Sequence, residues 1–408
     1  MKKKCIILLF FFTLILTVKS SYSQGNTSYG TGTGASGQHN TLFGNNAGTS
    51  VVSTSKFNTF IGSQAGISNT ASSNVFIGYE VGYSNLDGSL NTFMGFRSGK
   101  TNSSGSYNAF FGFNSGLNNS TGGYNTFLGG QAGLSNTTGG SNVYIGYQAG
   151  RYSTTASSNI FIGNSSGADN SVGTLNVFLG HASGILNTTG RENTFLGTDT
   201  GRQNTSGIGN TFVGQYSGYS NNTGDYNVYL GKSAGIGNNG SRNVFLGYRA
   251  GEGITGSNML VINNGLNTPL IYGDFSTDQV GINTTTIPSG YALAVKGKTI
   301  TEEVLVRLHS TWPDYVFEKE YELLPLNELE NYIRLNGHLP NIPEANDVAE
   351  NGILLGEMNA RLLEKIEELT LYTLQQEETL QDQKSKNEQL EARIEKLEVL
   401  VKNRASQK

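Results

Sequence analysis

Hydrophobic and polar positions recur along most of this chain with a period of about 17 residues. The unit reads N-x-φ-φ-G-x-x-small-G, so a short run of apolar or β-branched residues is bounded by an asparagine and a glycine. Short runs of this kind, bounded by turn residues, are typical of β-strands. Thirteen copies are present, with nine consecutive intervals of 17 residues. Their first residues are Asn40, Asn58, Asn74, Asn91, Asn108, Asn125, Asn142, Asn159, Asn176, Asn193, Asn210, Asn227 and Asn243.

This repeat predicts a mainly β fold, a parallel β-solenoid of about 13 17-residue coils over residues 40–262. A period of 17 is too short for a pair of helices and suits one turn of a solenoid, in which each coil stacks on the last. Two glycines four residues apart, such as Gly62 and Gly66, allow the chain to turn a corner where φ is positive. One asparagine per coil can form a hydrogen-bonded ladder. We therefore expect a structural role for the asparagines and no binding site.

Strand alternation divides the repeat into two faces. The second and fourth positions share one face, and the third position, aromatic in twelve copies, points the other way. Because a thin coil has a single interior, we expect the aromatic column to be covered by self-association, as a trimer interface and stack. A wider coil that encloses both faces is the alternative. The column consists of Phe60, Phe76, Phe93, Phe110, Phe127, Tyr144, Phe161, Phe178, Phe195, Phe212, Tyr229 and Phe245.

Beyond the repeats, the pattern changes. Residues 263–300 predict a β-rich neck, and residues 301–354 a small α+β segment in which a helix starts near Leu326. A heptad pattern over 355–408 predicts a coiled coil. Isoleucine at a with leucine at d does not choose between two and three strands. The expected coiled-coil core comprises Leu362, Ile366, Leu369, Leu380, Leu390, Ile394, Leu397 and Val401.

The first residues predict export. Three lysines precede a short apolar run, and small residues flank a cleavage point before Gln24, which is the pattern of a secretory signal peptide over residues 1–23. The run is too short for a transmembrane anchor. Residues 24–39 would then be an N-terminal leader. The single cysteine, Cys5, lies in the signal segment, so no disulfide is expected in the mature chain.

Charge is concentrated in the C-terminal part, where residues 299–408 carry 12 Lys+Arg and 22 Asp+Glu. The chain has no basic region, so no nucleic-acid partner is expected. Twenty Phe and twenty Tyr argue against disorder.

Candidate chemistry is sparse. The four histidines lie far apart without metal-ligand spacing, and no P-loop, nucleophile elbow or facing pair of carboxylates is recognisable. We expect no cofactor, no metal and no catalytic residue. One variable position, directly after the first glycine, is aromatic in Tyr79, Phe96, Phe113, Tyr147 and Tyr248. Such a row has two interpretations, stacking against sugars or packing at a seam between protomers.

The repeats N-T-F-I-G-S-Q-A-G (58–66) and N-V-Y-I-G-Y-Q-A-G (142–150) resemble the head repeats of trimeric autotransporter adhesins. That resemblance, which covers residues 40 to about 262, implies left-handed parallel β-rolls joined as trimers. The repeat here is longer and richer in aromatics, and the C-terminus shows no set of alternating membrane strands.

The motifs W-P-D-Y-V-F (312–317), L-L-P-L (323–326), H-L-P-N-I-P (338–343) and residues 351–369 resemble the tail of repeat-bearing bacterial surface proteins. More distantly, they resemble the intramolecular chaperone domain of phage tail fibres and endosialidases, which implies trimerisation and a role in folding. Ser310 is the only serine near the start of this segment and has no lysine at a matching distance, so self-cleavage is not expected.

The sequence therefore predicts a non-enzymatic, adhesin-like fibrous protein, secreted or on a bacterial cell surface and assembled as a homotrimer. A surface glycan or an extracellular host protein is a possible further partner. The alternatives are a carbohydrate-binding or polysaccharide-degrading β-solenoid and a phage-like tail fibre.

Overall fold

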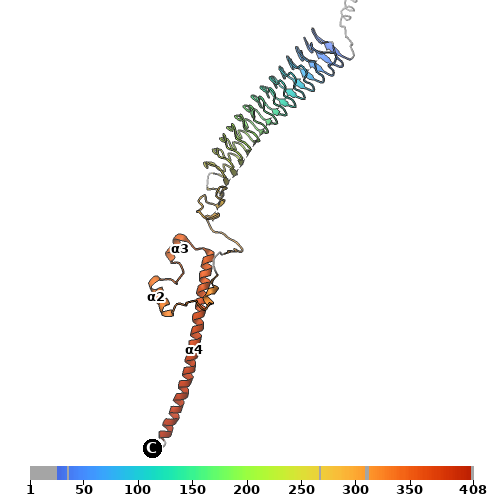
Figure 1. Ribbon diagram of the computed structural model, residues 1–408. Coiled ribbons are helices and arrows are strands. Elements are labelled where there is room, and N and C mark those ends of the chain that lie inside the picture. The colour runs from blue at the N-terminus through green and yellow to red at the C-terminus, as the bar shows by residue number, and fades with distance from the viewer. Residues whose placement is uncertain (1–24, 35, 266–267, 308–311, 406–408) are drawn as a thin grey trace, which may run out of the picture. The chain divides into compact units, whose positions relative to one another are not determined.

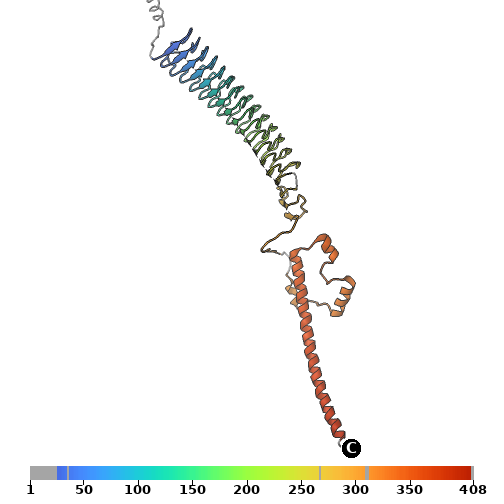
Figure 2. The same ribbon diagram turned by 180° about the vertical axis from the view of Figure 1, so that it is seen from behind.

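The computed structural model describes residues 25–34, 36–265, 268–307 and 312–405. The chain divides into two compact units, one up to residue 299 and one from residue 300 onward. Figures 1 and 2 show the first unit as a stack of short strands and the second as helices. The predicted signal peptide, residues 1–23, lies outside the described residues.

The first unit is a parallel β-solenoid, as predicted. Its strands pair in chain order, each with the next, and identical repeat positions face one another, for example Phe110 opposite Phe127. The strands are β1 (Thr27–Tyr29), β2 (Thr41–Phe43), β3 (Thr59–Ile61), β4 (Val75–Ile77), β5 (Thr92–Met94), β6 (Ala109–Phe111), β7 (Thr126–Leu128), β8 (Val143–Ile145), β9 (Ile160–Ile162), β10 (Val177–Leu179), β11 (Thr194–Leu196), β12 (Thr211–Val213), β13 (Val228–Leu230), β14 (Val244–Leu246) and β15 (Met259–Ile262).

The solenoid begins earlier than predicted. Strand β1 pairs in parallel with β2, and Asn26 accepts a hydrogen bond from the backbone of Asn40 at 2.8 Å. Residues 24–39, which we expected to be a leader, therefore contain an additional coil. Its repeat motif is degenerate, with Ser28 where later coils carry an aromatic ring, which is why the pattern did not reveal it.

Aromatic rings fill the interior of the solenoid. All twelve rings of the column are 0% exposed in a single chain, and neighbouring rings stack with centroids 4.6–5.0 Å apart. The predicted stack and the predicted alternation of faces are confirmed. The placement of this column at a trimer interface is wrong, because the rings keep no surface with which to contact another chain. The interior is the aromatic face, and the face at the second and fourth positions is turned outward.

Asparagine ladders run alongside the rings. In the predicted ladder, the backbone N–H of each repeat asparagine donates to the Oδ1 of the asparagine one coil earlier, at 2.8–3.0 Å. A second ladder, which the repeat analysis did not identify, joins side chain to side chain: Asn102 Nδ2 donates to Asn85 Oδ1 at 2.6 Å, and Asn119 continues it. Buried amides that are paired in this way stabilise the stack, whereas unpaired ones would destabilise it.

Tyrosine interrupts the second ladder. Tyr144 replaces phenylalanine in the column, and its hydroxyl donates to Ser153, which stands where other coils carry an asparagine. The ladder therefore stops at Asn136, whose buried Oδ1 has no hydrogen-bond partner among the described groups. At the second tyrosine, the Tyr229 hydroxyl bonds to Asn238 at 3.1 Å.

The neck follows as predicted. Strand β16 (Ile271–Asp274) pairs antiparallel with β15, β17 (Gln279–Ile282) pairs antiparallel with β16, and β18 (Leu293–Val295) pairs in parallel with β17. The change from parallel to antiparallel pairing ends the repeat stack and covers the hydrogen-bonding edge of β15.

The second unit comprises η1 (Pro313–Phe317), α2 (Leu326–Asn336), α3 (Ala345–Asn351) and α4 (Leu355–Ala405). Helix α2 starts at the predicted residue, and α4 starts where the heptads begin. Between residues 301 and 354 the described residues form helices and loops and contain no strand, so the expected α+β character is not found there. Figure 1 shows α2 and α3 in an arch beside α4.

Candidate functional site

The solenoid interior is filled by stacked rings and paired amides, so candidate sites lie at the surface. No group of three or more His, Cys, Asp or Glu side chains in the described part of the chain could hold a metal ion. Two exposed apolar surfaces lie on α4 and on the solenoid. A polar hollow in the C-terminal unit is lined by residues that include His338, Asp347, Arg361 and Glu364.

Helix α4 exposes its apolar side. The eight side chains predicted as the coiled-coil core are between 46% and 65% exposed in the single chain. They recur along one side of a helix of 51 residues. Polar residues interrupt the middle of the row at Thr373, Gln376, Gln383 and Asn387. An exposed apolar row of this kind is typical of a helix that pairs with another helix. The structure thus confirms the helix and the exposure of its heptad row, while its pairing stays a prediction.

The opposite side of α4 carries charged groups that the same chain covers. The Tyr315 hydroxyl in η1 donates to Glu364 at 2.8 Å, and Lys365 forms ion pairs of 2.9 Å with Glu364 and Glu368. Tyr321 donates to Glu368. The hydrogen bond to Glu364 raises the pKa of Tyr315 to about 12. Burial alone would raise the pKa of Glu364, but hydrogen bonds from Lys365, Tyr315 and Asn341 outweigh it and lower that pKa.

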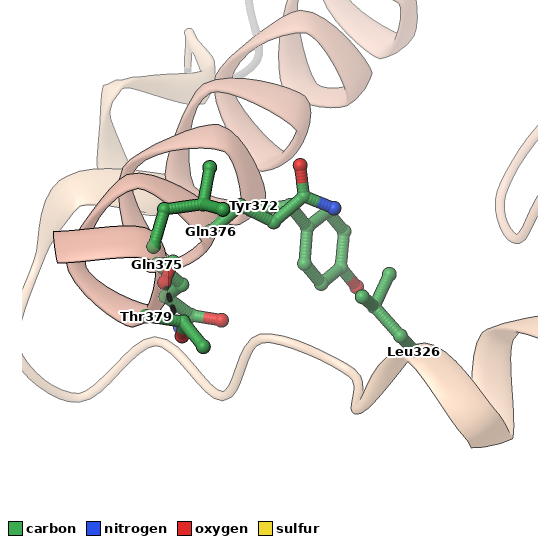
Figure 3. Close-up of a pocket in the computed structure, with 6 residues that line it drawn as sticks. Leu326, Tyr372, Gln375, Gln376 and Thr379 are labelled. Atoms are coloured by element: carbon green, nitrogen blue, oxygen red, sulfur yellow. Dashed lines mark hydrogen bonds between the residues drawn. The ribbon is translucent and has the colours of Figure 1, made fainter. Parts of the chain in front are cut away.

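A shallow apolar groove lies where the connection before α2 crosses α4. Figure 3 shows the ring of Tyr372 reaching from α4 toward Leu326, with Gln375, Gln376 and Thr379 beside it. The Tyr372 hydroxyl donates to the backbone carbonyl of Leu324, which fixes this crossing. The groove also includes Leu380, a member of the heptad row, so it is continuous with the exposed apolar side of α4.

The outward face of the solenoid sheet is also apolar. The fourth repeat position carries Ile, Leu, Met, Phe or Val in every copy, and Ile61, Met94 and Leu128 are 40–47% exposed. The second position carries Thr, Val, Ala or Ile. These residues form two parallel columns along the stack, because equivalent positions pair in register from coil to coil.

Two exposed rows border this face. The leading row is the residue directly before each repeat asparagine, and the trailing row is the residue directly after the first glycine. Bulky apolar members of the leading row are Phe57, Leu90, Tyr107, Tyr124, Leu175 and Tyr226, which are 49–65% exposed. The aromatic members of the trailing row, Tyr79, Phe96, Phe113, Tyr147 and Tyr248, are 42–47% exposed. Repeat analysis identified the trailing row but missed the leading row, whose side chains vary more.

The rings of these rows stack along the solenoid axis. Tyr107 and Tyr124 stack at 4.8 Å with planes 4° apart, and Tyr79 stacks on Phe96 at 5.6 Å. Stacking covers one face of each ring in such a pair, whereas Phe113 and Tyr147 lie 6.4 Å apart and tilted by 40°. Both interpretations for the trailing row, stacking against sugars and packing at a seam, therefore stay predictions.

No helix among the described residues is long and apolar enough to span a membrane. No protein-family model, curated protein or solved structure matches the chain.

Proposed function

We propose that this protein is a secreted or cell-surface fibrous protein, an adhesin-like stalk that is assembled as a homotrimer through its C-terminal helix. The observation that carries this proposal is the combination of an in-register solenoid rod with a 51-residue helix whose apolar heptad row is exposed. A rod holds a binding surface away from the cell, and an unpaired heptad row pairs with the same row on another copy of the chain.

The second unit supports the assembly step. Large apolar side chains of this unit, including Leu305, Trp312 and Leu335, are 51–80% exposed, whereas its most buried groups include Glu364 and Glu367. A unit that leaves most of its large apolar residues exposed gains a larger hydrophobic core when copies associate. Three strands, rather than two, are proposed from the resemblance of the repeats to trimeric adhesins.

A folding role for α4 follows from the same proposal. Parallel solenoids are dominated by non-local strand pairing, which makes folding slow and leaves edges open to aggregation. Association of residues 355–404 would hold three chains at high effective concentration while their repeats form.

Surface labelling of the organism tests the proposed location. Antibodies against the repeats should label intact cells or the culture supernatant, and the N-terminus of the recovered chain should begin at Gln24. Retention inside the cell with Met1 in place would contradict the proposal. If a strain that lacks the gene adhered to surfaces as well as the parent strain, the adhesin role would be contradicted, whereas the spacer role would be unaffected.

A further inference from the structure

Gly130 is the only glycine in the trailing row, because the other twelve coils carry a side chain at this position. Backbone conformation does not require glycine here, since the φ angle of Gly130 lies outside the left-handed region. Space does require it. A methyl group on Gly130 would come within 2.3 Å of Cε1 of Phe113, so the Phe113 ring occupies the place that a side chain would take. The glycine therefore lets this ring lie across the next coil.

Tyr147 inclines toward the same glycine from the other side. Phe113 and Tyr147 are two coils apart, which corresponds to about 10 Å along the stack. Their ring centroids are nevertheless only 6.4 Å apart, and the ring planes are tilted by 40°. At this tilt the rings are not stacked on each other, and both side chains stay exposed, by 45% and 46%. The two rings and Gly130 form an apolar surface, the two-ring platform.

Three amide side chains flank this platform. Asn114, Gln131 and Gln148, the amide row, directly follow the trailing position in three successive coils. Gln148 Nε2 donates to Gln131 Oε1 at 2.9 Å and to the Tyr147 hydroxyl at 3.1 Å. Gln131 Nε2 has no hydrogen bond within the described part of the chain, and Asn114 Oδ1 has no partner there either. The row therefore offers hydrogen-bonding groups beside the rings that the chain itself does not use.

The platform and the amide row carry no charge. Neighbouring cations make contacts of their own. Arg97 pairs with Glu80 at 2.8 Å, and the guanidinium of Arg151 lies 4.8 Å from the centre of the Tyr152 ring. A ligand of these six residues is therefore uncharged, because none of them would offset the desolvation of an ion.

We propose that the two-ring platform and the amide row bind a neutral glycan. The C–H faces of a sugar ring are apolar and stack on aromatic rings, whereas its hydroxyl groups both donate and accept hydrogen bonds. An apolar surface with a few placed polar groups is the usual composition of a site for a small ligand. Because the coils repeat about every 4.8 Å, consecutive sugar units of an extended chain lie over consecutive coils. This inference rests on the proposed function, of which it names the ligand class and the contact residues.

The size of the platform favours a glycan over a protein partner. Two aromatic side chains that are about half exposed offer on the order of 200 Å² of surface. A specific protein interface needs about 800 Å² from each partner. Elsewhere in the row, as where Tyr79 stacks on Phe96, the neighbouring ring already covers one face. The open part of the row is therefore large enough for a few sugar units and too small for a protein surface.

Binding of the full chain to immobilised polysaccharides tests the proposal. The probes are three neutral polysaccharides, amorphous cellulose, β-1,4-mannan and a β-1,3-glucan, and one acidic polysaccharide, polygalacturonate. We expect binding to at least one neutral polysaccharide. Phe113→Ala and Tyr147→Ala should each weaken it about tenfold, because each removes a stacking surface. Tyr248→Ala is the matched control: this ring is 45% exposed in the same row but six coils away, so binding should be unchanged.

Gly130→Ser tests the geometry without removing a ring. Another coil carries Ser63 at the same position, so the fold should tolerate serine, and an unchanged melting temperature would check this. The new side chain would displace the Phe113 ring from its place over the coil. Binding should therefore fall about as far as in Phe113→Ala. Ser63→Ala, which touches neither ring, is the control and should bind normally.

Three results would overturn the proposal: no binding to any neutral polysaccharide, binding that the ring variants leave unchanged, and binding confined to polygalacturonate. A lower mass for Phe113→Ala in light scattering would identify the platform as a contact between copies and would also overturn it. Surface labelling of cells separates the two levels of inference. Labelled cells without glycan binding reject the ligand and retain the proposed location. A protein that binds the glycan but stays inside the cell retains the ligand site and rejects the proposed function.

Discussion

The two units of this protein differ in how completely one chain buries its large apolar side chains. In the solenoid, aromatic rings such as Phe127 are completely buried in a single chain, and the amides beside them are paired. In the C-terminal unit, Glu364 and Glu367 are buried, while Leu369 and Val401 are 63% and 65% exposed. One chain thus leaves most large apolar side chains of the C-terminal unit in contact with water. The solenoid interior is therefore complete in one chain, whereas the heptad row of α4 is left exposed by it.

The largest effect is expected from a charge placed in the heptad row of α4. Ile394→Asp should abolish association, because an unpaired carboxylate would be buried at the centre of the helix bundle. The circular dichroism of the solenoid strands should persist, since its interior is self-contained. Lys396→Asp, two residues away and outside the row, is the matched control and should assemble normally. If Ile394→Asp abolished both the association and the circular dichroism signal of the solenoid strands, folding of the solenoid would depend on association of the C-terminal unit.

A cavity in the ring column should have the next largest effect. Phe127→Ala should cost about 3–5 kcal/mol per chain, because the ring is fully buried between Phe110 and Tyr144. Thr121→Ala, at an exposed position before the same strand, is the control and should change stability little.

Removal of the whole coil 125–141 should be milder than Phe127→Ala. The deletion rejoins equivalent interfaces, since each coil contacts only its neighbours. Thermal melts of the two variants compare the effects directly. A greater loss of stability from the deletion would contradict a stack of interchangeable coils.

Completion of the interrupted asparagine ladder should give a smaller gain. Tyr144→Phe with Ser153→Asn would reproduce the arrangement of the neighbouring coils and give the buried Oδ1 of Asn136 a donor. We expect a gain of about 1 kcal/mol, the typical net value of a buried hydrogen bond. Ser153→Asn alone should gain less, because the Tyr144 hydroxyl competes for the new amide. Equal melting temperatures for the single and double variants would contradict this coupling.

The smallest effect should be a local response to acid in the C-terminal unit. The pKa of Glu364 is lowered from its ordinary value of 4.5, because the hydrogen bonds from Lys365, Tyr315 and Asn341 outweigh the effect of burial. Its stabilising contribution is therefore complete above pH 4.5 and is lost as the pH falls through the lower folded pKa. Trp312, the only tryptophan, adjoins η1. Its fluorescence should report release of η1 from α4 in that pH range.

Glu364→Gln provides the control for the acid response. Glutamine keeps a hydrogen-bonding side chain at this position but cannot titrate. The Trp312 transition below pH 4.5 should therefore disappear or become shallower in this variant. An unchanged transition would assign the acid response to other groups.

The repeat spacing was enough to predict the solenoid, its register and the asparagine ladder, because a strict period leaves few ways to stack one coil on the next. The heptads were enough to place α4. The position of the aromatic column was predicted wrongly, because alternation separates two faces but does not say which one is interior. Side-chain shape decides that: flat rings such as Phe110 and Phe127 stack within one narrow coil.

The repeat pattern could not predict some features of the structure, for physical reasons. Strand β1 has Ser28 at the interior position where the column has its rings, and the leading row varies in size, so neither gives a periodic signal. The contacts of η1 with α4 join residues nearly 50 positions apart, such as Tyr315 and Glu364. Local patterns carry no information about such long-range pairs.

Light scattering on residues 24–408 at micromolar concentration tests the central claim most directly, that copies complete the packing which one chain leaves open. The account predicts three times the mass of one chain, and Ile394→Asp should reduce it to that of one chain. A monomer mass for the unaltered protein would contradict the account.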